Sequence, residues 1–260
     1  MEHTHTVNHI YYYNKCNCRN NYNFGDYVTP YIYKKINGKE AITGQKEKHV
    51  MGAGSILGRS NSNSIIWGTG FIFGNEQKIT SHKILSVRGK LTGQRLINTG
   101  IQCPESYGDI GLILPHFYKP SIEKKYKLGI IPHYIDVPIF KKIGHMGDDT
   151  IIIDVTDPIE DVVNSIISCE YTISSSLHGI IVSHAYNVKS MWIRMSDLIV
   201  GGNFKFRDYY SSVIEKGWEN LSPHIYKEPV VIDDMIGLIN NYPNPEFPIN
   251  TRHILDLCPF

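Results

Sequence analysis

The segment spanning residues 151–194 constrains the fold more than any other part of this chain. Short apolar runs at residues 151–155, 171–174 and 190–194 are typical of strands that are buried on both faces. The stretches between them carry apolar residues at helical spacing. A strand–helix–strand–helix–strand order predicts parallel strands joined by right-handed crossovers, which is a Rossmann-like α/β sheet.

The first half of the chain repeats this style less regularly. Apolar runs at residues 48–51, 64–67 and 83–87 each lead into a turn that contains glycine. Helices are predicted just after Asp26 and over residues 90–98. Glycine in such turns permits positive φ angles and a close approach of the backbone to a ligand.

A polar stretch at residues 119–125 separates the two halves and predicts a domain boundary. We therefore expect an α/β protein with two Rossmann-like domains, residues 1–120 and 121–260, which face each other across a cleft. Because ligands of such sheets bind beyond the carboxyl ends of the strands, the functional residues are sought there.

The composition excludes several classes of function. The chain has 260 residues and a formal net charge of +1, so no nucleic-acid-binding surface is expected. No apolar run approaches the ~18 residues of a transmembrane helix, and no signal peptide is visible, which predicts a cytoplasmic protein. Five scattered cysteines argue against a disulfide framework. The spacing of Cys16 and Cys18, near His3, His5 and His9, fits no zinc pattern, so no metal is expected.

The most informative motif is Ser-Ser-Ser-Leu-His-Gly at residues 174–179, where a buried strand should end and a helix begin. A helix N-terminus presents free N–H groups and the positive end of the helix dipole, which suits an anion. His178, in the first turn, adds an imidazole of the type that changes charge near neutral pH. An anion site beside a titratable imidazole predicts phosphate chemistry.

Four other residues have both a functional and a structural interpretation. Arg88 follows an apolar strand and carries a fork suited to phosphate or carboxylate, but it would equally suit a salt bridge between domains. His116 and His133 each follow an apolar strand and a proline, so each is either a cleft residue or an ordinary loop histidine. Asp26 is either a cleft carboxylate or a helix cap.

Seven short motifs, in family order along the chain, resemble those of the polysaccharide pyruvyl transferase family. They are Asn-Phe-Gly-Asp at 23–26, Trp-Gly-Thr-Gly at 67–70, Arg-Gly at 88–89, Gly-Asp-Ile-Gly-Leu-Ile-Leu-Pro at 108–115, Ile-Pro-His at 131–133, Leu-His-Gly at 177–179 and Phe-Lys-Phe-x-Asp-Tyr-Tyr at 204–210. The resemblance implies a GT-B-like pair of Rossmann-like domains. It also implies transfer of a pyruvyl group from phosphoenolpyruvate onto a sugar hydroxyl pair, as a cyclic ketal in a bacterial capsule or exopolysaccharide.

With this resemblance the candidate residues take specific roles. His178 is expected to be the general acid or a phosphate ligand, and Asp26 or His133 to accept the hydroxyl proton. The expected donor-binding residues are Arg88, Ser175, Ser176, Gly179, Arg194 and Lys205. The expected acceptor-binding residues are Asp109 and His116, with the acceptor on the side of residues 1–120. No cofactor is implied beyond phosphoenolpyruvate as co-substrate, and the family implies an acceptor linked to polyprenyl diphosphate at the inner membrane face.

The chain departs from the family pattern at Ser176, where the resemblance implies an arginine that contacts the anionic donor. Either this chain belongs to a subgroup with serine there, or another cation takes over that contact. The candidates for such a replacement are Lys189, Arg194, Lys205 and Arg207.

Two alternatives from other classes stay open. A GT-B glycosyltransferase would use the same cleft and helix N-terminus to hold the diphosphate of a nucleotide sugar. A non-catalytic sugar- or anion-binding protein with a degenerate site would account for the serine at position 176. The first alternative predicts nucleotide binding, and the second predicts donor binding without turnover.

Overall fold

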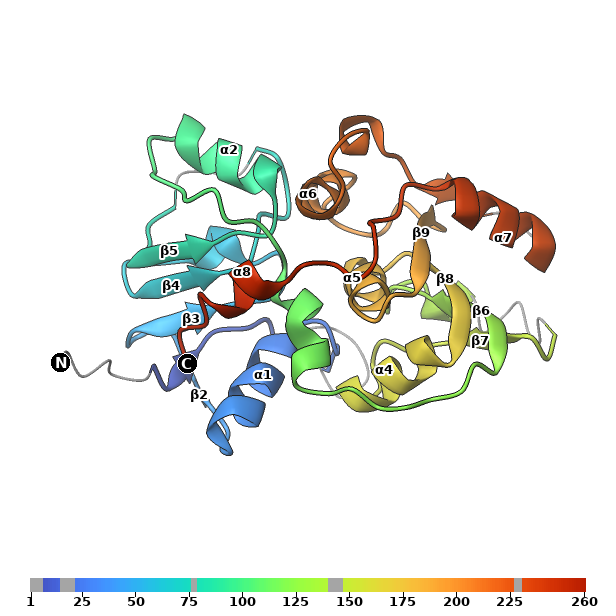
Figure 1. The fold of residues 1–260 in the computed structure, drawn as a ribbon. Helices are drawn as coiled ribbons and strands as arrows, with labels where there is room; N and C mark the ends of the chain where they lie inside the picture. Colours follow the sequence, from blue (N-terminus) through green and yellow to red (C-terminus); the bar gives the residue numbers. More distant parts are fainter. Residues whose placement is uncertain (1–6, 15–21, 76–78, 140–146, 227–230) are drawn as a thin grey trace.

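The computed structural model describes residues 7–14, 22–75, 79–139, 147–226 and 231–260, and its fold is built on two parallel sheets (Figure 1). The first sheet has the order β2-β1-β3-β4-β5, with β1 at His9–Ile10, β2 at Ile42–Thr43, β3 at His49–Met51, β4 at Ser64–Trp67 and β5 at Lys83–Ser86. The second has the order β10-β9-β8-β6-β7, with β6 at Tyr126–Ile131, β7 at Thr150–Ile152, β8 at Cys169–Ser174, β9 at Lys189–Arg194 and β10 at His224–Ile225. All neighbouring strands run parallel.

The two sheets share one topology. Counted along the chain within each sheet, both have the strand order second, first, third, fourth, fifth. In such a sheet the order reverses between the first and third strands, which are β1 and β3 here, and β6 and β8 in the second sheet. A crevice opens at this switch point, because the chain leaves it in opposite directions on the two sides.

Helices connect the strands and cover the sheets. The α-helices are α1 (Val28–Asn37), α2 (Lys90–Asn98), α4 (Ile159–Ile167), α5 (Leu177–Ala185), α6 (Phe204–Val213), α7 (Ile232–Asn241) and α8 (Arg252–Leu255). Short 3-10 helices occur at η2 (Leu57–Arg59), η3 (Ile110–His116) and η4 (Trp218–Asn220). The parallel sheets and the β8–α5–β9 unit confirm the predicted Rossmann-like α/β class.

The apolar run before His116 was predicted to be a strand, and this prediction is wrong. It forms η3, which begins where the Asp109 carboxylate accepts the N–H of Gly111 at 2.9 Å. Ile110 to Leu114 are all buried, in contact with α5. Because a fully buried helix and a fully buried strand both show an unbroken apolar run, the sequence pattern does not distinguish them.

Two segments of the second half return to the first sheet. Helix α6 packs on α2, while Phe206 in α6 stacks on Trp192 of β9 with ring centroids 4.2 Å apart. Near α8, the indole N–H of Trp67 donates to the carbonyl of Ile254 at 3.0 Å, and the Phe260 ring packs edge-on against Trp67. The domain boundary near residue 120 stays a prediction, since these contacts join sequence on both sides of it (Figure 1).

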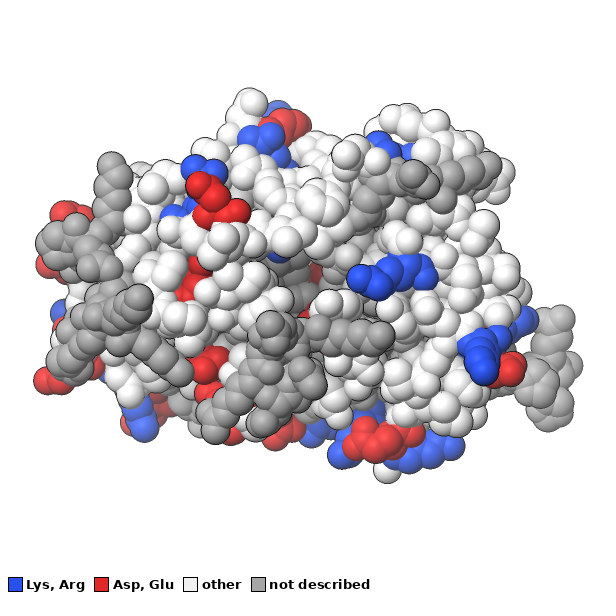
Figure 2. Space-filling model, turned by 180° about the vertical axis from the view of Figure 1, so that it is seen from behind, with Lys and Arg blue, Asp and Glu red and all other residues white. Residues whose placement is uncertain are grey.

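Three sequence expectations concern the surface charge, membrane-spanning helices and a zinc site near the N-terminus. On the face shown in Figure 2, the coloured basic side chains form separate small groups among acidic ones rather than one continuous basic surface. Within the described residues, no helix is long and apolar enough to cross a membrane. Of the residues weighed as a zinc site, His3, His5, Cys16 and Cys18 lie outside the described part of the chain.

Candidate active site

A cavity of about 340 Å³ lies between the two sheets, where both strand orders reverse. Its wall is built by the loops that follow β1, β3, β4, β6, β8 and β9, together with the turn before α1 and the start of α6. This is the position at which open α/β sheets bind ligands. Its polar and charged lining residues are Tyr13, Asn23, Asp26, Ser55, Arg59, His133, Tyr134, Ser176, His178 and Lys205.

The N-terminus of α5 forms one wall of the cavity. Ser176 is its N-cap residue, and its side chain makes no capping hydrogen bond, although it lines the cavity. The turn is held from behind by Ser174, whose hydroxyl oxygen accepts the N–H of Ser176 at 3.0 Å and lies 2.8 Å from the Ile131 carbonyl oxygen. The first N–H groups of α5 and the positive end of its dipole therefore remain available to an anion.

His178 projects from the first turn of α5 into this cavity. Its ring packs edge-on against Phe24, with centroids 6.4 Å apart. A Cβ atom on Gly25 would lie 2.3 Å from Nδ1 of the ring, so only glycine at position 25 leaves room for the imidazole. The turn that carries Phe24 and Gly25 therefore packs against the ring and restricts its position.

Asp26 lines the cavity as well, and its interpretation as a helix cap is wrong. The N-cap residue of α1 is Tyr27, and no side chain caps this helix; the preceding turn is instead held by Asn23, whose Oδ1 accepts the N–H of Gly25 at 3.0 Å. Burial raises the pKa of Asp26 from 3.8 to about 6, although the charges of His178 and Lys205 oppose the shift. A carboxyl group with this pKa exchanges protons near neutral pH.

Lys205 brings a buried ammonium group to the cavity. Its side chain is 7 % exposed, and within the described residues its Nζ has no hydrogen bond or ion pair, its nearest aromatic contact being the Phe206 ring at 5.4 Å. Burial, helped by the charge of Arg88, lowers the pKa of Lys205 from 10.5 to about 8. A buried cation without a partner is costly, which makes this position a strong candidate for anion binding.

His133 completes the set of titratable groups. Burial, together with the nearby charge of Lys205, lowers its pKa from 6.5 to about 3. The ring is therefore neutral at ordinary pH and is a weak base. Its backbone N–H donates to the Ser175 hydroxyl oxygen at 2.9 Å, which fixes the loop after β6 to the turn after β8.

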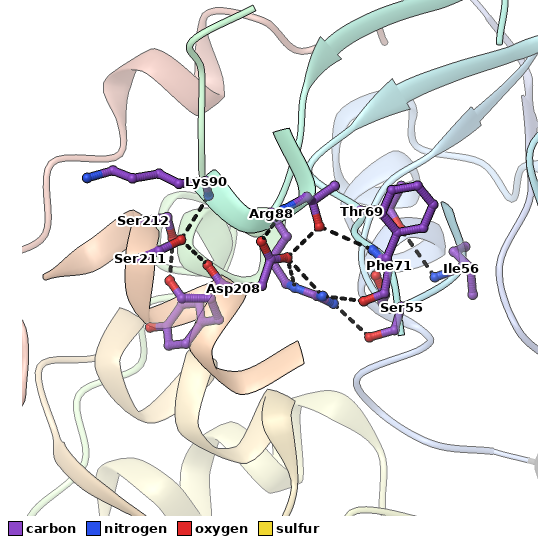
Figure 3. Close-up of polar contacts among 12 residues, drawn as sticks. Ser55, Ile56, Thr69, Phe71, Arg88, Lys90, Asp208, Ser211 and Ser212 are labelled. Atoms are coloured by element: carbon purple, nitrogen blue, oxygen red, sulfur yellow. Dashed lines mark hydrogen bonds and ion pairs between the residues drawn. The ribbon is translucent and has the colours of Figure 1, made fainter. Parts of the chain in front are cut away.

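Arg88, which was expected to bind the donor, is fully buried and does not line the cavity. Its guanidinium group donates to Asp208 Oδ2 at 2.9 Å, to the Ser55 hydroxyl at 2.6 Å and to the Phe71 carbonyl at 2.5 Å (Figure 3). The structure thus contains the alternative weighed for Arg88, an internal salt bridge that joins the first half to α6. Through Ser55, which does line the cavity, Arg88 supports the wall from behind.

Three more expected donor-binding residues also lie outside the cavity wall. The Ser175 hydroxyl is buried and donates to Asp136 Oδ2 at 2.7 Å. Gly179 packs inside the molecule, where a Cβ atom would lie 2.3 Å from the Ser174 hydroxyl oxygen. Arg194 is exposed and lies 3.7 Å from the Asp197 carboxylate. Of the cations considered as replacements at Ser176, only Lys205 lines the cavity.

Neither expected acceptor-binding residue lines the cavity. His116 is exposed, and its Nε2 lies 3.0 Å from the Thr251 hydroxyl, on the other side of η3. Asp109 is fully buried behind the His178 ring, 3.8 Å from its Nε2.

Arg59 is a cavity residue that sequence reasoning missed. It ends η2, lines the cavity and places its guanidinium carbon 5.2 Å from the centre of the Tyr13 ring. Within the described residues it pairs with no carboxylate, so it offers a second positive charge near the mouth. The sequence signal that could have identified Arg59 was its position just after the glycine-bearing turn that follows β3.

Fold and site together define a doubly wound α/β protein whose cavity brings a helix N-terminus, two basic side chains and titratable groups together. A model of the polysaccharide pyruvyl transferase family matches residues 3–197 of the chain. The chain therefore belongs to the polysaccharide pyruvyl transferase family, as its motifs predicted. The match includes Asp26, His133 and His178, whereas Lys205 lies beyond its end.

One relative among curated proteins is "Uncharacterized protein L143" of Acanthamoeba polyphaga mimivirus. It is 30% identical over 204 residues, which cover 73% of this chain and 70% of that protein. No solved structure matches the chain.

Proposed function

We propose that this protein transfers the pyruvyl group of phosphoenolpyruvate onto two hydroxyl groups of a sugar, forming a cyclic ketal in a polysaccharide. The observation that carries the proposal is the unpaired, buried ammonium group of Lys205. It shares one cavity with the open N-terminus of α5 and with the proton-transfer groups of His178 and Asp26. Family membership supports the transfer of a pyruvyl group.

Donor binding follows from the charges of the cavity. Phosphoenolpyruvate carries a phosphate and a carboxylate, and the cavity offers Lys205, Arg59 and the N-terminus of α5 to hold them. Lys205 takes over the role that an arginine at the position of Ser176 would have had. Because the ammonium group is already desolvated, binding an anion relieves a cost that the free protein carries.

The first step of the reaction requires two proton transfers. A proton from His178 adds to the methylene carbon of phosphoenolpyruvate, which makes C2 electrophilic, and a sugar hydroxyl adds there as Asp26 accepts its proton. The phosphate group then leaves and the second hydroxyl closes the ring, so the products are a ketal and inorganic phosphate. Asp26 is a better base than His133, because its pKa of about 6 lies closer to neutrality than the value of about 3 for His133.

We assign the acceptor to the side of residues 1–120, which supply Asp26, and the donor to the side of residues 121–260, with Arg59 contacting the donor from the first side, in a GT-B-like arrangement of the two sheets. The acceptor that we assign is an oligosaccharide linked to polyprenyl diphosphate, as in the synthesis of capsule or exopolysaccharide. It would be modified in the cytoplasm, at the inner face of the membrane.

Binding and turnover of phosphoenolpyruvate test this proposal. In a thermal-shift panel, phosphoenolpyruvate at a hundredfold over its Kd is expected to stabilise the protein by about 2.7 kcal/mol, whereas nucleotide sugars are not. With a panel of sugar acceptors, inorganic phosphate release is expected from the wild type and not from His178→Ala, which should still bind the donor. A shift with nucleotide sugars alone would make the protein a glycosyltransferase, and donor binding without turnover on any acceptor would make it a binding protein.

The pH dependence of kcat/KM is expected to be bell-shaped, with its maximum between the pKa values of Asp26 and Lys205, about 6 and about 8. Below the lower value Asp26 is protonated and cannot accept the hydroxyl proton. Above the upper value Lys205 is neutral and cannot hold the anionic donor. The measurement is kcat/KM for phosphoenolpyruvate across pH, and Asp26→Asn should lose the acidic limb of its residual activity. A profile without an acidic limb in the wild type would contradict the role of Asp26.

A further inference from the structure

Two buried polar atoms beside the cavity lack hydrogen-bond partners, and they belong to neighbouring side chains. They are Nε2 of His178 and Oδ2 of Asp109. The same Nε2 lies 3.8 Å from Oδ1 of Asp109, and both side chains are almost completely removed from solvent. Buried polar groups are nearly always paired, so two adjacent exceptions call for a functional explanation.

The carboxylate of Asp109 is fixed independently of the histidine. Its Oδ1 accepts the N–H of Gly111 at 2.9 Å as the N-cap of η3. The imidazole is confined from the opposite side, because Gly25 leaves room only for the ring edge that carries Nδ1. The two nitrogens of His178 therefore have different surroundings, with Nε2 turned toward a carboxylate and Nδ1 toward the turn that carries Asp26.

We propose that Asp109 is a positioning residue, which accepts a hydrogen bond from Nε2–H of His178 and leaves Nδ1 as the nitrogen that exchanges a proton with the substrate. This inference rests on the proposed function and deepens it. A carboxylate behind an imidazole fixes its tautomer and orientation and stabilises the imidazolium form. The separation of 3.8 Å is that of the free protein, in which catalytic hydrogen bonds are often long before substrate binds.

The proton balance assigns one role to each nitrogen. Nδ1–H of the imidazolium gives its proton to the methylene carbon of phosphoenolpyruvate. The Nε2 proton stays on the ring and remains hydrogen-bonded to Asp109. Asp26 takes the proton of the first hydroxyl, and the proton of the second hydroxyl leaves with phosphate or to solvent. After the ketal has left, Asp26 releases its proton to solvent and His178 takes one up, so both groups return to their starting state.

The competing explanation is that Asp109 only caps η3, and two substitutions separate the roles. Serine is as good an N-cap as aspartate but is too short to reach His178, so Asp109→Ser keeps the cap and removes the contact. Asp109→Asn keeps an acceptor oxygen in place and removes only the charge. Asp154→Ser is the matched control, because Asp154 caps the N–H of Thr156 in the same way at 2.9 Å and does not line the cavity.

The decisive measurement is nitrogen-15 NMR of the histidine side chains in the free protein, with the His178 signals identified by their loss in His178→Gln. We expect the wild type to show a ring proton on Nε2 that is protected from exchange with water, and Asp109→Ser to lose this protection. The Asp154→Ser control should keep it. A ring proton on Nδ1, or an Nε2 proton that exchanges equally fast in the wild type and in Asp109→Ser, would overturn the proposal.

Turnover supplies the second readout. On an acceptor that supports phosphate release by the wild type, Asp109→Ser should lower kcat by about 10²- to 10³-fold with little change in KM for phosphoenolpyruvate. Asp109→Asn should recover part of the loss. An Asp109→Ser protein that folds and turns over at the wild-type rate refutes the positioning role. The NMR result stands apart from the proposed function, so a protected Nε2 proton without phosphoenolpyruvate turnover would refute that function and leave the His178–Asp109 pair intact.

Discussion

Replacing Lys205 with methionine is expected to weaken phosphoenolpyruvate binding by about 10- to 150-fold, since a hydrogen bond to a charged group contributes roughly 1.5–3 kcal/mol. Methionine fills the space of the lysine stem, so the wall of the cavity should persist without the ammonium group. Isothermal titration of the donor into the two proteins measures the change.

The same substitution is expected to raise stability near pH 7. Folding lowers the pKa of Lys205 from 10.5 to about 8, so holding its proton costs the folded state about 3 kcal/mol at neutral pH. This cost is complete below pH 8 and fades as the pH rises toward the unfolded value, so the gain from Lys205→Met should shrink in alkali. Lys189→Met is the matched control, because Lys189 is exposed and its Nζ donates to Asn240 Oδ1 at 3.0 Å. Wild-type donor affinity in Lys205→Met would remove the main support for the proposed function.

Replacing Asp208 with asparagine is expected to destabilise the protein by about 3–5 kcal/mol, the usual cost of breaking a buried ion pair from one side. Asp208 and Arg88, whose contact is drawn in Figure 3, are both 0% exposed, so no solvent replaces the lost carboxylate. At the start of α2, Asp208 Oδ1 accepts a hydrogen bond from the N–H of Thr92 at 2.7 Å. The side-chain oxygen of asparagine can still accept this hydrogen bond. The free energy of unfolding from chemical denaturation measures the effect.

A double substitution shows whether charge or packing is responsible. Arg88→Met combined with Asp208→Asn removes both charges, so it should be less destabilised than the sum of the single changes. The exposed pair of Arg252 and Asp256, 2.7 Å apart, is the matched control, and Asp256→Asn should change stability by less than about 1 kcal/mol. Equal effects of Asp208→Asn and Asp256→Asn would mean that the buried pair contributes no more than a surface one.

The sequence predicted β3 to β9, because parallel strands buried on both faces leave a distinctive pattern. It missed β1, β2 and β10, which are only two residues long and leave no such pattern. The strands and helices between residues 169 and 194 lie within two residues of their predicted positions. The prediction failed at residues 110–114, where a 3-10 helix is as thoroughly buried as a strand. The topology that these elements adopt then placed His178, His133 and Lys205 in one cavity, although 72 residues of sequence separate the outer two.

Arg88 and Asp109 were placed wrongly for the same reason: the sequence does not reveal which residues distant along the chain will contact them. Arg88 was expected at the ligand because it follows a strand, yet its charge is neutralised by Asp208, 120 positions away. Asp109 was expected at the acceptor, but the ring of His178 lies between it and the cavity. Arg59 was missed because it belongs to a short helix beyond the turn rather than to the strand end itself.

Helix α6 also limits how such a protein can be recombined with its relatives. In sequence it lies between β9 and β10 of the second sheet, and its Phe206 stacks on Trp192 there, but Asp208 caps α2 and neutralises Arg88 on the first side. A chimera joined at residue 120 would bring a foreign α6 against a native α2 and would mismatch a buried charge. A graft that exchanges the first sheet therefore has to carry α6 as well, together with the C-terminal segment that contacts Trp67.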